Sequence, residues 1–268
     1  MAWLPSLVKR LGPLNMSMLV LAAVIVIHMA VYAFTPKPST GLGSEWWYTV
    51  YSAGPVSIEP VIYNERVAVE AIEYCEAGLC YKTVTENPFY VYHNYLVGGS
   101  LLVKTTIRDK SADRTTEIVY KPPVIARPES FAKGYSVAED FNAWITVSTR
   151  EEDTRKIENS NRVIKVVENG TITVADVPHV TYLVEELVNG SLWKKYWFSE
   201  EVNEALYFEL YGSGPHSLTW GRLTSYRLNS GMPADALQIS LPLGLKLWHL
   251  ILVFIILLFV KQLGKMLD

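Results

Sequence analysis

The chain has 268 residues, a formal net charge of -3 and a mean hydropathy of +0.15. A net charge this close to zero provides no strong field for nucleic acid, so we exclude nucleic acid as a partner. The mean hydropathy is high for a soluble protein and directs attention to long apolar runs.

The first apolar run covers residues 14–34 and contains no charged residue. A helix needs roughly 20 apolar residues to cross about 30 Å of hydrocarbon, so the run predicts a transmembrane helix after a short tail, residues 1–13. Val31-Tyr32-Ala33 also matches a signal-peptidase site, which leaves a cleaved signal peptide as the alternative. The length of the run favours an uncleaved anchor.

The second apolar run covers residues 241–260, and its single charged residue is Lys246. It predicts a second transmembrane helix, followed by a basic tail at residues 261–268. Lys9, Arg10, Lys261 and Lys265 flank the two runs on the sides away from the central segment. Positive charge favours the cytoplasmic side. We therefore expect a two-pass protein of the cell membrane with both termini in the cytoplasm.

The central segment consists of a linker rich in Pro, Gly and Ser at residues 35–45 and a predicted extracytoplasmic β domain at residues 46–240. Short runs rich in Val, Ile, Thr and Tyr alternate apolar with polar residues, which is typical of half-buried strands. They cover residues 66–74, 89–96, 100–108, 144–149, 162–167, 180–188 and 205–211. The fold expected is an antiparallel β sandwich or an open barrel.

Turn signals divide this domain. Asn169-Gly170 and Asn189-Gly190 are predicted hairpin turns. Pro122-Pro123 and Arg127-Pro128 indicate either an internal boundary or a long loop, and residues 151–158 are predicted to be a solvated charged loop.

Cys75 and Cys80 are the only cysteines, and four residues including a glycine separate them. In an extracytoplasmic compartment this spacing favours a disulfide across a hairpin loop. A redox pair or a copper site is the alternative. Copper would need a nearby His or Met, and His93 is distant in sequence.

Asn169 and Asn189 each begin an N-x-[ST] sequon, so both are predicted glycosylation sites of a glycoprotein. Turn chemistry alone also explains an Asn-Gly pair at each position.

His28 and His249 lie within the two apolar runs. An ionisable side chain inside a membrane helix is costly and suggests function. Both would lie about 10 Å below the outer boundary, so together they could bind one haem b iron. The alternative is that each histidine hydrogen-bonds to a neighbouring helix or lies near the headgroups.

Enzyme signatures are absent from the sequence, which lacks G-x-S-x-G, H-E-x-x-H, a Walker loop and C-x-x-C-H. We therefore predict no catalytic residue, although a triad assembled across the fold would leave no such signature.

Three segments resemble the ResB family of cytochrome c biogenesis membrane proteins. They are LGPLNMSML at residues 11–19, TVTENPFY at 83–90 followed by Tyr92 and Tyr95, and the closing apolar run with its basic tail. The family's two further upstream helices are missing here, and Tyr95-Leu96 replaces its Tyr-Gln pair. The chain thus resembles a shortened, divergent relative.

The resemblance implies a membrane-anchored accessory protein that delivers haem in cytochrome c biogenesis, beside an integral haem-handling partner of the CcsA type. Two hypotheses of other classes stay open. One is a b-haem-binding subunit of a respiratory membrane complex, and the other is a cofactor-free glycosylated surface or assembly protein.

Overall fold

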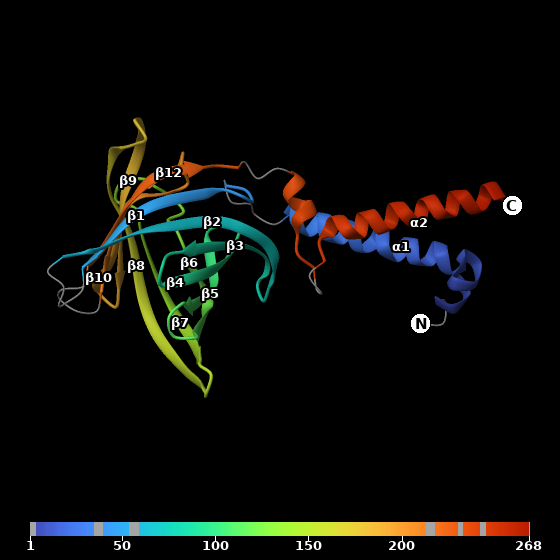
Figure 1. Ribbon diagram of the computed structural model, residues 1–268, viewed down its shortest axis with the longest axis horizontal. Helices are drawn as coiled ribbons and strands as arrows, with labels where there is room; N and C mark the ends of the chain where they lie inside the picture. Colours follow the sequence, from blue (N-terminus) through green and yellow to red (C-terminus); the bar gives the residue numbers. More distant parts are fainter. Residues whose placement is uncertain are drawn as a thin grey trace.

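The computed structural model describes residues 4–34, 40–53, 59–212, 218–229, 233–241 and 245–267. Within these residues the chain runs from helix α1 through twelve strands and a short 3-10 helix, η1, to helix α2 (Figure 1). Residues 35–39 of the predicted linker lie outside the described residues.

The strands follow one another with short connections, and their bounds are β1 Glu45–Ala53, β2 Val61–Cys75, β3 Gly78–Glu86, β4 Tyr90–Val97, β5 Leu101–Asp109, β6 Arg114–Ile125, β7 Ser136–Ser148, β8 Asp153–Val174, β9 Val177–Val188, β10 Ser191–Ser199, β11 Glu204–Tyr211 and β12 Leu218–Arg227. Every run of residues predicted as a strand from the sequence falls mostly within one of these elements.

The strands form one closed barrel in which each strand pairs antiparallel with its neighbours in sequence, and β1 closes the ring by pairing with β12. The expected mainly β domain is thus confirmed as a closed barrel rather than a sandwich or an open barrel. Closure gives every strand a partner on both sides and removes the exposed edges that an open sheet would leave.

The barrel wall follows the alternation of its strands. In β1, Trp46, Tyr48 and Val50 are buried, whereas the residues between them are only partly buried. Successive side chains of a strand point to opposite faces, so one set fills the interior and the other forms the outer surface. Aromatic and β-branched residues suit both faces of such a wall.

The two predicted Asn-Gly turns have different outcomes. Asn189-Gly190 connects β9 to β10, and both residues have positive φ, as a tight hairpin requires. Asn169-Gly170 lies inside β8, so that turn prediction is wrong. The hairpin reverses instead at Ala175-Asp176, where φ is 47° and 65°. Alanine rarely adopts this conformation, so this turn could not be predicted from the residue types.

Two further sequence interpretations need correction. Residues 153–158 belong to β8, so only residues 151–152 of the predicted charged loop lie in the connection from β7 to β8. Pro122-Pro123 lies within β6 and marks no domain boundary, because the strands on both sides belong to the same barrel.

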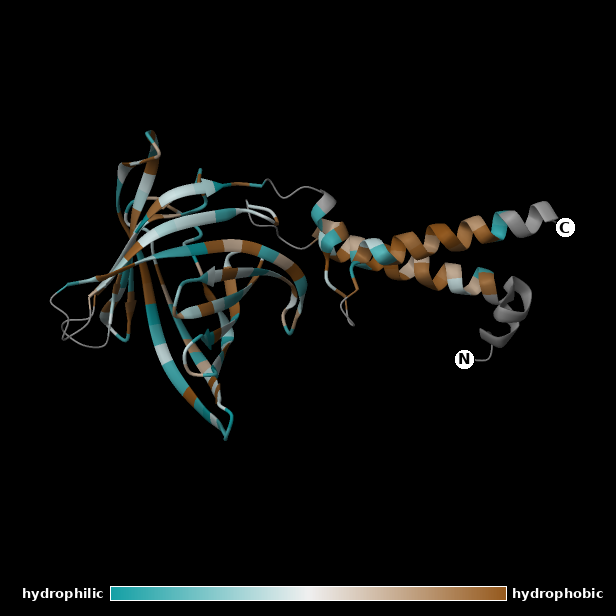
Figure 2. Cartoon of the chain, in the orientation of Figure 1, coloured by the Kyte–Doolittle hydropathy of each residue, from teal (hydrophilic) through white to brown (hydrophobic). Residues whose placement is uncertain are grey.

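Helices α1 (Leu4–Phe34) and α2 (Leu247–Leu267) run antiparallel, side by side, away from one end of the barrel (Figure 1). We call this end, where β1 begins and β12 ends, the helix-facing end. Helix α1 starts ten residues before the predicted run at 14–34, and α2 starts at Leu247 rather than at residue 241. The apolar residues of both helices form a continuous hydrophobic stretch (Figure 2).

By length and composition, Leu14–Phe34 is sufficient to cross a membrane. In α2 the described apolar part, Leu247–Gln262, is shorter.

A shared apolar core joins the helix pair to the barrel. The residues buried in it include Tyr32 from α1, Ile72 from β2, Leu79 from β3, Ile239 after η1 and Leu247 at the start of α2. Backbone hydrogen bonds reinforce the junction, since the Ser240 N–H donates to Ile72 O at 2.8 Å. Helix η1 (Pro233–Gln238) contributes Ala236 to the same core. The β2–β3 hairpin therefore packs directly against the ends of both helices.

Candidate functional site

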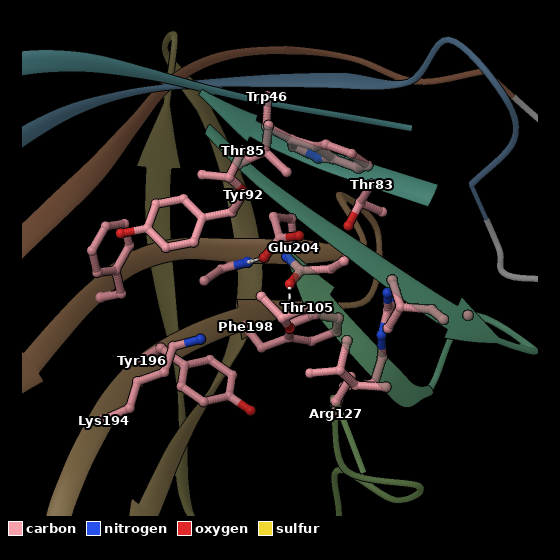
Figure 3. Close-up of a pocket in the computed structure, with 18 of the residues that line it drawn as sticks. Trp46, Thr83, Thr85, Tyr92, Thr105, Arg127, Lys194, Tyr196, Phe198 and Glu204 are labelled. Atoms are coloured by element: carbon pink, nitrogen blue, oxygen red, sulfur yellow. Dashed lines mark hydrogen bonds between the residues drawn. The ribbon is translucent and has the colours of Figure 1, made fainter. Parts of the chain in front are cut away.

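The interior of the barrel contains a cavity of about 500 Å³ (Figure 3). It extends from Thr40 and Gly99 at the helix-facing end to Trp193 and Leu210 towards the opposite end. This volume lies within the range of sites that bind small molecules.

Nearly half of the residues that line the cavity are aromatic or hydroxylated. The alternation of the strands turns these side chains inward from seven strands and from the segment before β1. The aromatic and hydroxyl side chains are Trp46, Tyr48, Tyr81, Tyr92, Tyr120, Trp193, Tyr196, Phe198, Phe208, Thr40, Thr83, Thr85 and Thr105. Such a wall offers apolar surface together with scattered hydrogen-bonding groups.

Two β1 side chains hydrogen-bond to the backbone around the start of β11, which is two strands from β1 in the barrel. Trp46 Nε1 donates to Val202 O at 3.0 Å, and Tyr48 Oη donates to Ala205 O at 2.8 Å. Burial holds the pKa of Tyr48 well above its usual range, so the hydroxyl keeps its proton for this bond. These bonds make the helix-facing half of the cavity rigid.

Phe208 enters the cavity because its neighbour on β12 is a glycine. A Cβ atom at Gly221 would lie 2.4 Å from the Phe208 ring. Phe208 in turn meets the Tyr48 ring edge-on, with centroids 5.7 Å apart. Gly221 is thus required by the packing of the wall.

Arg162 forms a satisfied ion cluster in the wall. Its Nε donates to Glu139 Oε1 at 2.8 Å, and Nη1 donates to Glu186 Oε2 at 3.4 Å. Nη2 also donates to the carbonyl of Ile125. Two carboxylates and a carbonyl therefore compensate this cation inside the barrel.

Arg127 lies in the connection from β6 to β7 and points into the cavity at the helix-facing end (Figure 3). Its Nη1 donates to Asn203 Oδ1, and its guanidinium lies 5.7 Å from the Phe198 ring centroid. Asn203 is itself fixed, because Nδ2 donates to Thr40 Oγ1 at 3.0 Å. Burial lowers the pKa of Arg127, and the charge of Glu204 acts in the opposite direction.

Lys194, Glu65 and Glu204 add charges of both signs to the same cavity. Lys194 Nζ lies 4.4 Å from the ring centroid of Tyr196. Burial raises the pKa of Glu65, although Asn87 Nδ2 donates to its Oε2 at 3.0 Å and so favours the charged form. The cavity lining therefore combines apolar, polar and charged side chains rather than apolar ones alone.

The structure gives each histidine of the two apolar runs, His28 and His249, a local partner. His28 Nδ1 lies 2.7 Å from Val24 O, and a carbonyl can only accept, so Nδ1 donates and Nε2 keeps its lone pair. His249 Nδ1 accepts from the Lys246 N–H at 2.8 Å, which caps the start of α2. A neutral His249 then carries its proton on Nε2 and has no lone pair left for a metal.

These contacts bear on the expected haem site. His28 could bind iron through Nε2 as it stands, whereas His249 would first have to release its cap. The lining of the cavity includes no His, Cys or Met within the part of the chain that the structure describes. The residues present thus fit a bis-histidine haem poorly, and haem ligation by His28 and His249 stays a prediction.

The predicted disulfide is present between Cys75 and Cys80, with Cα atoms 5.9 Å apart. It closes the tip of the β2–β3 hairpin. Among the described residues no cluster of three or more His, Cys, Asp or Glu side chains could hold a metal ion.

The two sequon asparagines are both exposed. Asn189 lies at a hairpin turn, where its Oδ1 accepts from the Asn161 N–H at 2.9 Å and leaves Nδ2 outward for a glycan. Asn169 lies in a bulged part of β8, and Gly170 beside it contacts the Trp197 ring. Glycosylation at either site stays a prediction.

The cavity and its charged residues were missed by sequence reasoning. Tyr92 lies in a predicted strand, but its inward direction depends on register with the neighbouring strands. Arg127 was noted only as part of an Arg-Pro loop signal. Glu65 and Glu204 directly precede predicted strands, but most charged residues in such places face solvent.

The chain matches no family model and no curated relative in sequence. Three solved structures are similar in part. The hypothetical lipoprotein YmcC from Escherichia coli (K12) is 10% identical, with a TM-score of 0.35 over 72% of this chain and 93% of its own. A candidate lipoprotein from Parabacteroides distasonis is 13% identical, with a TM-score of 0.37 over 72% and 98%.

The third is a candidate outer membrane lipoprotein-sorting protein domain from Vibrio parahaemolyticus, 6% identical, with a TM-score of 0.24 over 78% of this chain and 93% of its own. These likenesses are too loose to bear on the function of this chain.

Proposed function

We propose that this chain is a membrane-anchored binding protein whose barrel holds a small amphiphilic molecule close to the membrane surface. The observation that supports this most directly is the cavity of about 500 Å³ inside the closed barrel. Side chains just fill the interior of an eight-stranded barrel, whereas the twelve strands here enclose a space that a ligand could occupy.

The composition of the wall supports an amphiphile. Aromatic rings such as Trp46, Tyr92 and Phe198 provide apolar contact area, and Thr83, Thr85 and the charged groups provide polar contacts. Sites for small molecules combine a mostly apolar wall with a few placed polar groups. A fully polar solute or a plain hydrocarbon would satisfy only part of this wall.

The place of the cavity supports a role at a membrane. The helix-facing end of the barrel is joined to both helices through the core around Ile72 and Leu247. With both helices crossing the bilayer, the barrel would stand outside the cytoplasm with its helix-facing end at the headgroups. The antiparallel arrangement of α1 and α2 suits this two-pass topology (Figure 1).

The experiment measures the binding of N-phenyl-1-naphthylamine, a neutral dye that fluoresces in apolar sites, to the full chain in lipid nanodiscs. Empty nanodiscs provide the background. We expect saturable binding above that background. In the double variant Thr83→Phe/Thr85→Phe, two added rings from β3 fill the cavity, so the saturable signal should fall at least severalfold.

Thr106→Phe is the matched control, because Thr106 follows the inward Thr105 on β5 and therefore lies on the outer face. It should bind the dye as the wild type does. Equal signals from nanodiscs with and without the protein, or equal binding by the filled and control variants, would reject a ligand site in the barrel.

Haem delivery is a second, narrower candidate. One observation favours it, the open Nε2 of His28 in α1. A visible spectrum of the purified chain tests it. Substoichiometric, easily lost haem would support delivery. A stable b-type spectrum would favour the respiratory subunit, and no haem would favour a cofactor-free protein.

A further inference from the structure

We propose that Arg127 binds the anionic group, a carboxylate or a phosphate, of the molecule held in the cavity. This inference rests on the proposed function and adds the chemical class of the ligand. The ligand would lie with its acid at the helix-facing end and its apolar body along the aromatic wall towards Trp193.

The first step is that the two arginines that line the cavity differ in how their charge is compensated. Arg162 is compensated by Glu139 and Glu186. Arg127 forms one hydrogen bond, to an amide oxygen of Asn203, and no ion pair within the described part of the chain. A guanidinium has five N–H donors, so most of those of Arg127 are available to a ligand.

The second step is the cost of this arrangement. The Arg127 side chain is partly buried. A cation that is even partly removed from water without a paired anion is unfavourable, and such groups are normally paired or hydrogen-bonded. Burial lowers the pKa of Arg127 for this reason. Glu204 lines the same cavity but does not reach the guanidinium, and its Oε1 accepts from the Ala205 N–H at 3.0 Å. An anionic ligand would supply the missing compensation.

The third step is that Arg127 is held in place. Its guanidinium lies over Phe198, and Phe131 stacks on that ring with centroids 4.7 Å apart. Asn203 fixes one edge of the guanidinium and is fixed in turn by Thr40. A planar guanidinium held in this way matches the two oxygens of a carboxylate or phosphate.

Lys194 also lines the cavity and carries a positive charge. It is a weaker candidate than Arg127 for binding the anionic group. Its ammonium contacts the Tyr196 ring and interacts electrostatically with the carboxylate of Glu65. It lies towards the end of the cavity away from the helices, paired across the strands with Leu210. It therefore does not share a site with Arg127.

The test displaces N-phenyl-1-naphthylamine from the full chain in nanodiscs with three competitors, octanoate, octan-1-ol and inorganic phosphate. Octanoate and octanol share a tail and differ in charge. We expect octanoate to displace the dye at about 10- to 100-fold lower concentration than octanol, since a charge-assisted hydrogen bond contributes that much. Arg127→Met should abolish this advantage, and Arg127→Lys should keep part of it.

Arg155→Met is the matched control, because Arg155 is an exposed residue of β8. It should retain the full preference for octanoate. Displacement by phosphate alone, lost in Arg127→Met, would support the anion site and assign it to free small anions. Displacement by octanoate but not by phosphate would support it and assign it to lipid-like acids.

Equal displacement by octanoate and octanol, unchanged in Arg127→Met, would overturn the anion site while leaving a ligand in the barrel. If the dye itself does not bind, the proposed function fails first. Circular dichroism of each variant in the nanodisc checks that Arg127→Met still folds, and Arg127→Lys keeps the test valid if it does not.

Discussion

The imidazole of His28 in α1 meets the ring of Tyr74 in β2 edge-on, with ring centroids 5.5 Å apart. Tyr74 is next to Cys75, so this contact joins the membrane helix to the disulfide-closed tip of the β2–β3 hairpin. The same hairpin contributes Ile72 and Leu79 to the core shared with α2. The barrel and the helix pair are thus packed as one body rather than joined only by linkers.

This packing predicts that Ile72→Ala destabilises the whole protein. Ile72 is 0% exposed and lies in the core that both helices share, so the lost side chain leaves a cavity. We expect a loss of about 2–5 kcal/mol in the free energy of unfolding, measured by denaturant titration in detergent. Ile62→Ala on the same strand is the control, because Ile62 is 61% exposed and should change stability by no more than about 0.5 kcal/mol. Similar losses in both variants would contradict a shared core.

The disulfide predicts a stabilised hairpin tip. Cys80 lies 5 positions after Cys75 in sequence, and the chain-entropy model gives about 2 kcal/mol for so short a loop. Cys75→Ser/Cys80→Ser should therefore lower the free energy of unfolding by roughly this amount. Mass spectrometry without reductant should show the wild type lighter by two hydrogens than the reduced chain. Two free thiols in the untreated protein would contradict the assignment.

Burial of Glu65 predicts a pH-dependent stability. Because burial raises the pKa of Glu65 in the folded state, the folded protein holds this proton more tightly than the unfolded chain does. The group therefore stabilises most when protonated at low pH, and this contribution is lost as pH rises from the unfolded pKa to the raised folded one. Glu65→Gln keeps an acceptor for Asn87 and stays neutral.

The variant should accordingly melt higher than the wild type at pH 7–8, and the gain should shrink as pH falls through the raised pKa. Glu168→Gln, at an exposed position of β8, is the control for the loss of a surface charge and should change the melting temperature little. A gain for Glu65→Gln that is the same at every pH would indicate a change in packing instead.

The sequence predicted the elements better than their arrangement. Alternation identified most strands, because a half-buried wall needs inward and outward residues in turn. Closure could not be predicted, since it depends on the pairing of β1 with β12, nearly the full length of the domain apart. The register that turns Tyr92 and Arg162 into the lumen is likewise set by pairing between strands.

The candidate site shows the same division. His28 and His249 stood out because charge is rare in apolar runs, yet the structure gives both local hydrogen bonds within their own helices or caps. Arg127 did not stand out from its sequence neighbours, because charged residues are common in loops. Its charge is unusual only in the folded barrel, where Phe198 and Asn203 contact the guanidinium and no carboxylate of the described residues pairs with it.

The two-pass topology can be tested with trypsin on right-side-out membrane vesicles. The turn between β7 and β8 holds Arg150, whose side chain is 83% exposed, and it belongs to the barrel. With both helices spanning the membrane, trypsin should cut near this turn and leave an epitope tag placed after residue 268 intact. Inverted vesicles should give the reverse, because the basic flanks at Lys9 and Lys261 favour the cytoplasmic side. If trypsin removes the tag and cuts the turn in the same vesicles, α2 does not cross the bilayer. N-terminal sequencing that begins at Phe34 would show instead that α1 is a cleaved signal peptide.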